Sequence, residues 1–306
     1  MSDYTLLEYV LSLGGQVVEV EDTRARWKRH ASGEGAPRIA GEGSHDVVEP
    51  STLSTAHIRP FIEYRAGGSL LKTSKGQVSP AVGGGQRGAV KGFSDNSRRR
   101  LLRTIGGIKR HADLPLFITL TYPEQFPNPS ESKKHLKMMF QRLGRKYSDH
   151  GSIWKLEPQE RGAPHYHILT WGVSLEKMQE YIPSIWFDIA GAQDKKHLSW
   201  HRGELGNGNK HCVQQVNSWR GVWSYASKYL GKTFEVSGWN ELWTGRYWGV
   251  INRDNVPFGE LVQQEVDIQK VVEVQRYQRR FTRIKKTNKS MTIFCDAQQW
   301  VDKLDL

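Results

Sequence analysis

The chain has 306 residues, of which 37% are hydrophobic and 25% are charged. This length suits one elaborated domain or two small ones. No apolar run approaches the roughly 20 residues needed to span a bilayer, and the N-terminus lacks a signal-peptide pattern, so we expect a cytoplasmic protein without a membrane partner. The two cysteines, Cys212 and Cys295, are too few for a disulfide framework or a cysteine-based zinc site.

The charge balance points to a polyanionic partner. Lysine and arginine together exceed the acidic residues by 12. An excess of this size favours nucleic acid as the partner, and eleven tryptophans and eleven tyrosines offer faces on which unpaired bases can stack. The alternative is a generic basic surface around core tryptophans.

Residues 1–92 are predicted to be an irregular, partly flexible extension. They begin with an apolar segment compatible with a short helix, and a short strand is expected around Ile58–Tyr64. Two stretches between these and Phe93, residues 21–54 and 66–91, are rich in glycine and in charged or small polar residues, which is typical of loops.

Regular elements are predicted from Phe93 onward, in a domain over 93–258 and a C-terminal helix and strand over 259–306 that pack on it or extend it. The helices are expected over 95–105 (capped by Ser94 or Asp95), from Ser130 or Ser132 to Tyr147, over 174–187, over 219–231 and over 259–285. The strands are expected over 116–123, 152–157, 164–171 and 212–216, with a polar loop over 195–210 and a final strand and short helix after Met291. This order predicts an α+β fold with a central, mainly antiparallel sheet of about five strands flanked by helices.

A candidate metal site lies on two of these strands. His165 and His167 are separated by one residue, so on a strand they point to the same face. Glu157, on the preceding strand, reaches them if the intervening turn folds that strand back; Gln159 and Glu160 are the rival ligands. Two imidazoles and a carboxylate leave coordination positions open for phosphate oxygens, although sheet histidines beside a surface glutamate are the simpler interpretation.

A second constellation lies on the helix over 219–231. Tyr225 with Lys228 and Tyr229 with Lys232 repeat the pattern Tyr-x-x-Lys and fall within an arc of roughly 100° on one helix face, while other residues supply the apolar stripe. Tyrosines beside lysines suit an anionic substrate, because a phenol of pKa about 10 needs help to act as a nucleophile. The ending Leu230–Thr233 imitates a P-loop but lacks its first glycine and comes after a helix, so no nucleotide-binding loop is expected.

In this order the motifs resemble those of the HUH endonuclease superfamily of rolling-circle replication proteins. The three matching segments are FITLTYP (117–123), ERGAPHYHIL (160–169) and YASKYLGK (225–232). The resemblance covers residues 93–255, and the paired tyrosines resemble the two-tyrosine branch found in replication initiators of single-stranded DNA phages and plasmids.

The resemblance implies a five-stranded antiparallel sheet and a Mg²⁺ or Mn²⁺ ion held by His165, His167 and Glu157. Tyr225 or Tyr229 would nick single-stranded origin DNA, leaving a 5′-phosphotyrosyl link and a free 3′-hydroxyl, with Lys228 and Lys232 assisting. A host helicase and DNA polymerase in a bacterial cytoplasm would be the protein partners. The basic residues that are candidates for DNA contacts, or alternatively for a solvated helix face, are Arg98, Arg99, Arg100, Arg103 and Arg161.

Two other functions remain open at this point. A transposase or mobilisation relaxase of the same superfamily would share the chemistry, but relaxases carry a third histidine in the cluster, and we expect no third histidine near His165. A non-catalytic, basic DNA-binding regulator would explain the charge but not three motifs in this order.

Overall fold

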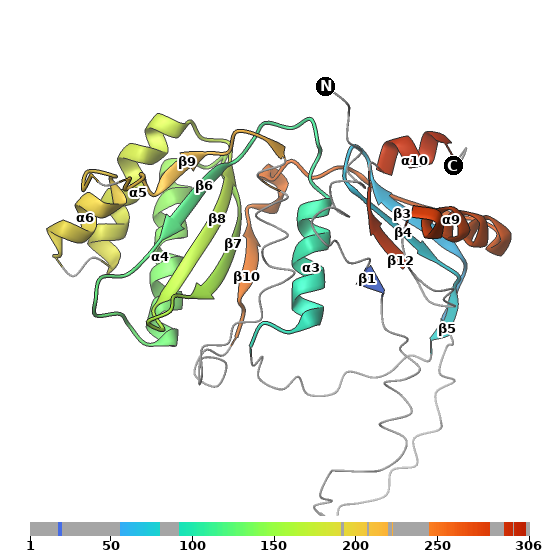
Figure 1. Ribbon diagram of the computed structural model, residues 1–306, viewed down its shortest axis with the longest axis horizontal. Helices are drawn as coiled ribbons and strands as arrows, with labels where there is room; N and C mark the ends of the chain where they lie inside the picture. The colour runs from blue at the N-terminus through green and yellow to red at the C-terminus, as the bar shows by residue number, and fades with distance from the viewer. Residues whose placement is uncertain are drawn as a thin grey trace, which may run out of the picture. The chain divides into compact units, whose positions relative to one another are not determined.

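The computed structural model describes residues 18–19, 56–79, 92–190, 193–206, 208–219, 222, 245–281, 291–295 and 297–303 (Figure 1). The chain divides into two compact units, one of residues 87–259 and one that combines residues 1–86 with 260–306. Helices and antiparallel strands occur in both, which confirms the predicted α+β class. None of the described helices is long and apolar enough to cross a membrane.

The unit of residues 87–259 is built on a five-stranded antiparallel sheet, as predicted. The strand order is β10-β7-β8-β6-β9, so β8 is central. The strands are β6 (Leu116–Leu120), β7 (Gly151–Pro158), β8 (Pro164–Trp171), β9 (Val213–Gln215) and β10 (Trp248–Ile251). Residues that alternate along β8 therefore belong to two different faces of the sheet.

One face of this sheet is covered by α4 (Pro129–Lys146) and α5 (Leu175–Ala190) (Figure 1). Tyr166 of β8 is fully buried there, with its hydroxyl 2.7 Å from Ser132 Oγ of α4 and its ring 6.4 Å from that of Trp186 of α5. The buried positions of α4 have helical spacing, as the sequence predicts: Ser132, Leu136, Met139, Phe140 and Leu143. The other face of the sheet carries His165 and His167.

The helix boundaries confirm some predictions and correct others. Helix α3 (Asp95–Gly106) is capped by Ser94, whose hydroxyl accepts from the backbone N–H of Ser97. Helix α4 begins earlier than predicted, because Asn128 is its cap. The prediction of a polar loop over 195–210 is wrong at its start, where Lys195–His201 forms α6, capped by Asp194.

The second unit contains another five-stranded sheet, of order β1-β12-β4-β3-β11. Its strands are β1 (Val18–Glu19), β3 (Phe61–Arg65), β4 (Leu70–Ser74), β11 (Leu261–Glu265) and β12 (Met291–Phe294), with the pair β2 (Ala56–Ile58) and β5 (Gln77–Ser79) forming a small sheet of its own. Strands from both ends of the chain thus pair within one sheet, a pairing that the sequence did not predict.

The predicted helix over 259–285 is wrong in its first part. Residues 261–265 instead form β11, which pairs antiparallel with β3, and the helix α9 spans Ile268–Phe281. The C-terminal strand β12 and the short helix α10 (Ala297–Lys303) confirm the expectation for the last segment. The core of this unit comprises Ile62, Leu71, Val274, Met291, Cys295 and Trp300.

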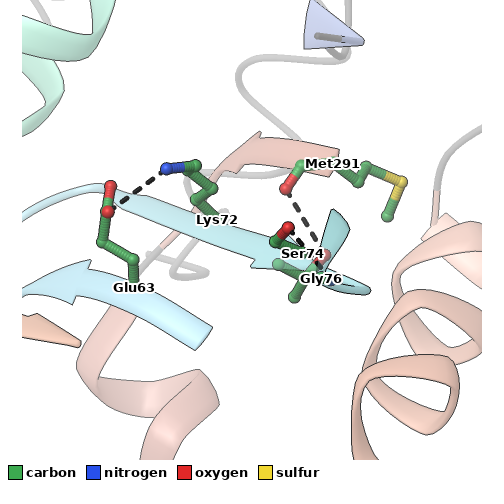
Figure 2. A network of polar contacts seen from close by, with 6 residues as sticks. Glu63, Lys72, Ser74, Gly76 and Met291 are labelled. Carbon is green, nitrogen blue, oxygen red and sulfur yellow. Dashed lines mark hydrogen bonds and ion pairs between the residues drawn. The ribbon is translucent and has the colours of Figure 1, made fainter. Parts of the chain in front are cut away.

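Polar contacts also join the strands of this second sheet (Figure 2). Lys72 Nζ of β4 donates to Glu63 Oε2 of β3 at 3.2 Å, across a directly paired position. Thr73 Oγ1 donates to the carbonyl oxygen of Met291, and the side chain of Gln275 on α9 donates to the same hydroxyl at 3.1 Å. These contacts fix the register of β4 against β12 and connect α9 to it.

Candidate active site

The β7–β8 hairpin assembles the first predicted constellation on one sheet face. Glu157 lies directly opposite His165, and Lys155 lies opposite His167. On the other side of β8, Thr119 of β6 is also paired with His167. The two histidine rings are 4.3 Å apart between centroids, and the ring of His167 stacks on Phe117 at 5.4 Å. Glu157, His165 and His167 are therefore neighbours, as the alternation of the strands predicts.

A tight turn and one arginine hold the end of this hairpin. The backbone N–H of Gly162 donates to the carbonyl of Gln159, and Gly162 has φ of 78°, a conformation that favours glycine. The guanidinium of Arg161 donates to the backbone carbonyls of Tyr122, Pro123 and Glu124, at 2.7, 2.9 and 3.1 Å. Arg161, predicted as a DNA contact, thus connects the turn to the segment after β6.

The rival metal ligands occupy different surroundings from Glu157. Gln159 Oε1 accepts from Arg161 Nε at 3.1 Å, and Glu160 is exposed. Glu157 is partly buried, and its two oxygens face Lys155 Nζ and His167 Nε2. Burial alone would raise the pKa of this carboxyl, but the hydrogen bond from His167 and the charge of Lys155 outweigh it and lower the pKa to about 2. Glu157 is therefore a carboxylate at neutral pH.

His165 is held as a neutral imidazole. Burial, and secondarily the charge of His167, lower its pKa to about 3, despite the opposing charge of Glu157. Its Nε2 atom is buried and has no hydrogen-bond partner among the described residues. A buried polar atom without a partner is costly, and ligation is one role that accounts for it. Neutral imidazole is also the form that binds a metal ion.

Helix α6 adds two histidines that were not among the predicted site residues. His201 Nε2 accepts from the backbone N–H of Thr121 at 3.4 Å, and His197 Nε2 lies 3.3 Å from Thr121 Oγ1. Both are buried, and burial lowers the pKa of His201 to about 3. The charge of His201 also lowers the pKa of His165, so the two lie within electrostatic range. The expectation of no third histidine near His165 is therefore wrong.

Two signals could have indicated these additional residues. His197 and His201 have the i, i+4 spacing that places two side chains on one helix face. Lys155 alternates with Glu157 on β7, which puts it on the histidine face, but its nearly complete burial (1% exposed) is visible only in the structure. Its ammonium group lies over the ring of Phe93 at 5.0 Å.

The metal itself is supported by donor chemistry more than by a finished coordination geometry. Within the described part of the chain, no group of three or more His, Cys, Asp and Glu side chains has the arrangement of a metal site. The carboxylate of Glu157 is instead paired with Lys155 and His167. The donors suit a divalent cation in type: a neutral imidazole, a second imidazole and an ionised carboxylate.

The remaining predicted residues belong to the tyrosine helix and to α3. Tyr225, Lys228, Tyr229 and Lys232 lie outside the described residues. On α3, Arg100 is exposed, whereas Arg98, Arg99 and Arg103 are partly buried. Trp248 of β10 donates its indole N–H to Ser97 of α3 at 3.0 Å, which places this basic helix beside the edge strand of the histidine sheet.

The fold and this site define an α+β protein with two histidines and a carboxylate on the central strands of an antiparallel sheet. Residues 115–234, less than half of the chain, match a family model for the replication-associated protein ORF2. This segment runs from β6 through β9 and includes His165, His167, His197 and His201 as well as both predicted tyrosines. The match supports a replication-associated role. No curated protein and no solved structure matches the chain.

Proposed function

We propose that this protein is a rolling-circle replication initiator that nicks single-stranded origin DNA and remains covalently attached to it through a tyrosine. The observation that carries the proposal is the placement of Glu157 directly opposite His165 on the central hairpin, within a segment that matches replication-associated proteins. HUH-type chemistry requires this combination, two histidines and an acidic residue on one sheet face, with a tyrosine further along the chain.

In this proposal His165, His167 and Glu157 hold Mg²⁺ or Mn²⁺. When bound, the ion would polarise the phosphodiester and offset the charge that develops on its oxygens. The chain prepares for it by keeping His165 neutral and Glu157 ionised. Lys155, buried beside Glu157, adds a positive charge on the same face and orients the carboxylate.

The nick itself is a transesterification. The hydroxyl oxygen of Tyr225 or Tyr229 attacks the phosphorus and gives up its proton. The bond between phosphorus and the 3′ oxygen breaks, and that oxygen takes a proton to become a free 3′-hydroxyl. The phosphate then links the tyrosine to the 5′ end of the strand. Lys228 and Lys232 would favour the phenolate and hold the phosphate.

The link conserves the phosphodiester bond, so the same chemistry can close a strand. A host polymerase extends the 3′-hydroxyl while a host helicase unwinds the duplex. When the origin is regenerated, the second tyrosine can cut it. The 3′-hydroxyl released in that cut attacks the first phosphotyrosine and closes the displaced strand into a circle.

A mobilisation relaxase is the second candidate, because the structure places His201 within electrostatic range of His165. The nick and the tyrosine link would be the same, and the two functions differ in the steps after the nick. An initiator supports extension from the nick and release of single-stranded circles from its own replicon. A relaxase instead transfers the nicked strand without needing that extension.

The test is covalent capture. The protein is incubated with labelled single-stranded and supercoiled DNA in the presence of Mn²⁺, denatured, and assayed for a protein–DNA adduct. We expect an adduct that EDTA abolishes and that is lost in the Tyr225→Phe/Tyr229→Phe double variant and in His165→Ala/His167→Ala. Each single tyrosine variant should keep part of the activity.

Matched controls come from residues away from the site. Tyr181→Phe removes a hydroxyl that donates to the carbonyl of Arg142 between α5 and α4, and His111→Ala removes an exposed imidazole. Both should leave the adduct yield unchanged. Absence of an adduct with any DNA, including the protein's own replicon, would instead favour a non-catalytic DNA-binding regulator.

A further inference from the structure

A cavity of about 560 Å³ lies on the histidine face of the sheet, outside the cluster of Glu157, His165 and His167. It is bounded by Trp200 of α6, by the loop after α6 and by the edge of the sheet. The residues of its wall that matter here are Thr119, Trp200, Lys210, His211, Cys212 and Gln214. Its size falls in the range of small-molecule and cofactor sites.

The strand register places this cavity next to the candidate active site. Thr119, on its wall, is directly paired with His167. Gln214, also on the wall, is paired with Phe117, whose ring stacks on that of His167. Since neighbouring strands are only about 4.8 Å apart, the cavity begins one strand away from the histidines and on the same face.

The opposite wall is connected to the histidine cluster through α6. The rings of Trp200 and His201 are 5.1 Å apart, and His201 accepts from the backbone N–H of Thr121. Trp200 is partly exposed, so part of its indole surface is available to a ligand. A ligand that contacts Trp200 therefore lies beside the segment that also holds His201.

The chemistry of the wall suits a nucleobase attached to a phosphate. Trp200 offers an aromatic face, and Lys210 contributes a cation. Gln214 donates to the carbonyl of His211 at 3.2 Å, which orients its amide for hydrogen bonding at the edge of a base. Among the described residues that line the cavity, none is acidic. An aromatic platform with neutral hydrogen-bonding groups and a nearby cation is how proteins bind unpaired bases.

We propose that this cavity binds one unpaired nucleobase of the DNA strand that passes His165 and His167, with Trp200 stacking on the base and Lys210 contacting the adjoining phosphate. The path of the strand rests on the proposed nicking function, whereas the base site rests on the cavity and its wall. Holding one base at a fixed place beside the histidines would set which phosphate of the strand lies over them.

The first experiment is photocrosslinking with the full chain. Short single strands carrying 5-iodouracil at one position each are bound to the Tyr225→Phe/Tyr229→Phe variant, which prevents cleavage, and are irradiated. We expect one position of the strand to crosslink to Trp200, as identified by mass spectrometry of the digested protein. Crosslinks that all map elsewhere would overturn the proposal.

Binding measurements on the same strands provide the second arm. Trp200→Ala should weaken binding about tenfold, and Trp200→Phe, which retains an aromatic face, should recover most of it. An abasic residue at the crosslinking position should weaken binding to the parent protein but not further to Trp200→Ala. Lys210→Ala should weaken binding more than Lys195→Ala, which removes the same charge from the first residue of α6.

The outcomes separate this inference from the proposed function. An adduct by covalent capture with no effect of Trp200→Ala on binding would leave the nicking function and remove the base site. A crosslink at Trp200 without any adduct would leave a DNA site and remove the nicking function. Tight binding of free deoxynucleotides that single-stranded DNA fails to displace would assign the cavity to a mononucleotide and overturn the proposal.

Discussion

Four histidines from two elements gather at one end of the antiparallel sheet. His165 and His167 come from the central strand, and His197 and His201 come from α6. Burial is the main reason that the pKa values of His165 and His201 both fall to about 3, with the charges of neighbouring histidines adding to it. Both imidazoles are therefore neutral across the physiological range and present lone pairs instead of positive charge.

The depressed pKa of His201 predicts a loss of stability in mild acid. Below about pH 6.5 the unfolded chain binds a proton at this imidazole and the folded protein does not, so stability declines as the pH falls from 6.5 toward about 3. At about pH 5 this one residue should cost roughly 2 kcal/mol. The measurement is urea unfolding of the parent protein and of His201→Gln at about pH 7 and about pH 5.

The variant should be less stable near neutral pH but should lose less on acidification, because glutamine does not titrate. His111→Gln, at an exposed position, should acidify like the parent protein. If His201→Gln lost as much stability as the parent between the two pH values, the imidazole would not be held neutral by the fold.

At this scale the sequence predicts the residues whose neighbours follow from local geometry. His165, His167 and Glu157 are brought together by the period of a strand and one short turn, both of which can be deduced from nearby residues. His201 joins them from a separate element further along the chain, through a contact with Thr121 that no local pattern encodes. Its position in a short helix of polar composition concealed it further.

At the scale of elements, α4 shows where a helix signal is ambiguous. Ser130 and Ser132 both resemble caps, but the structure assigns that role to Asn128, whose side chain accepts from the backbone N–H of Glu131 at 3.0 Å. Pro129 then occupies the first turn, where a missing N–H costs nothing. Ser132 is buried instead and contacts the hydroxyls of Tyr122 and Tyr166.

Asn128→Ala should therefore destabilise the unit of residues 87–259 by about 1 kcal/mol, because the first turn of α4 loses its side-chain acceptor. Ser130→Ala, at an exposed position in the same turn, should change stability by less than about half of that. Urea unfolding of the two variants beside the parent protein measures the difference. Equal effects, or a larger effect at Ser130, would mean that the helix begins where the sequence alone suggested.

Strand β11 shows the opposite limit of local prediction. The segment LVQQE is largely exposed and has no strong preference, so the helical pattern after it extended the predicted helix backwards. Its backbone instead pairs with β3, from the N-terminal part of the chain. Pairing across such a separation is set by the completed fold and not by the five residues themselves.

At the scale of the whole molecule, the two units differ in how the chain builds them. Residues 87–259 are continuous, and the backbone N–H of Gly259 closes this unit by donating to the carbonyl of Gly107. The other unit is discontinuous, because β3 and β4 from the N-terminal part are flanked by β11 and β12 from the C-terminal part. Its core likewise combines Ile62 and Leu71 with residues of α9, β12 and α10.

Truncation of the chain after Gly259 should therefore act on distant residues. It removes both flanking strands and α9, leaving β3 and β4 as a two-stranded hairpin, which is marginally stable alone. In hydrogen exchange measured by mass spectrometry, amides of residues 61–65 and 70–74 should lose their protection. Amides of β7 and β8 should keep theirs, because the histidine sheet draws no strand from the removed segment. Persistent protection of β3 and β4 would show that the N-terminal strands fold without the C-terminal ones, and loss of protection in β8 would show that the two units fold as one.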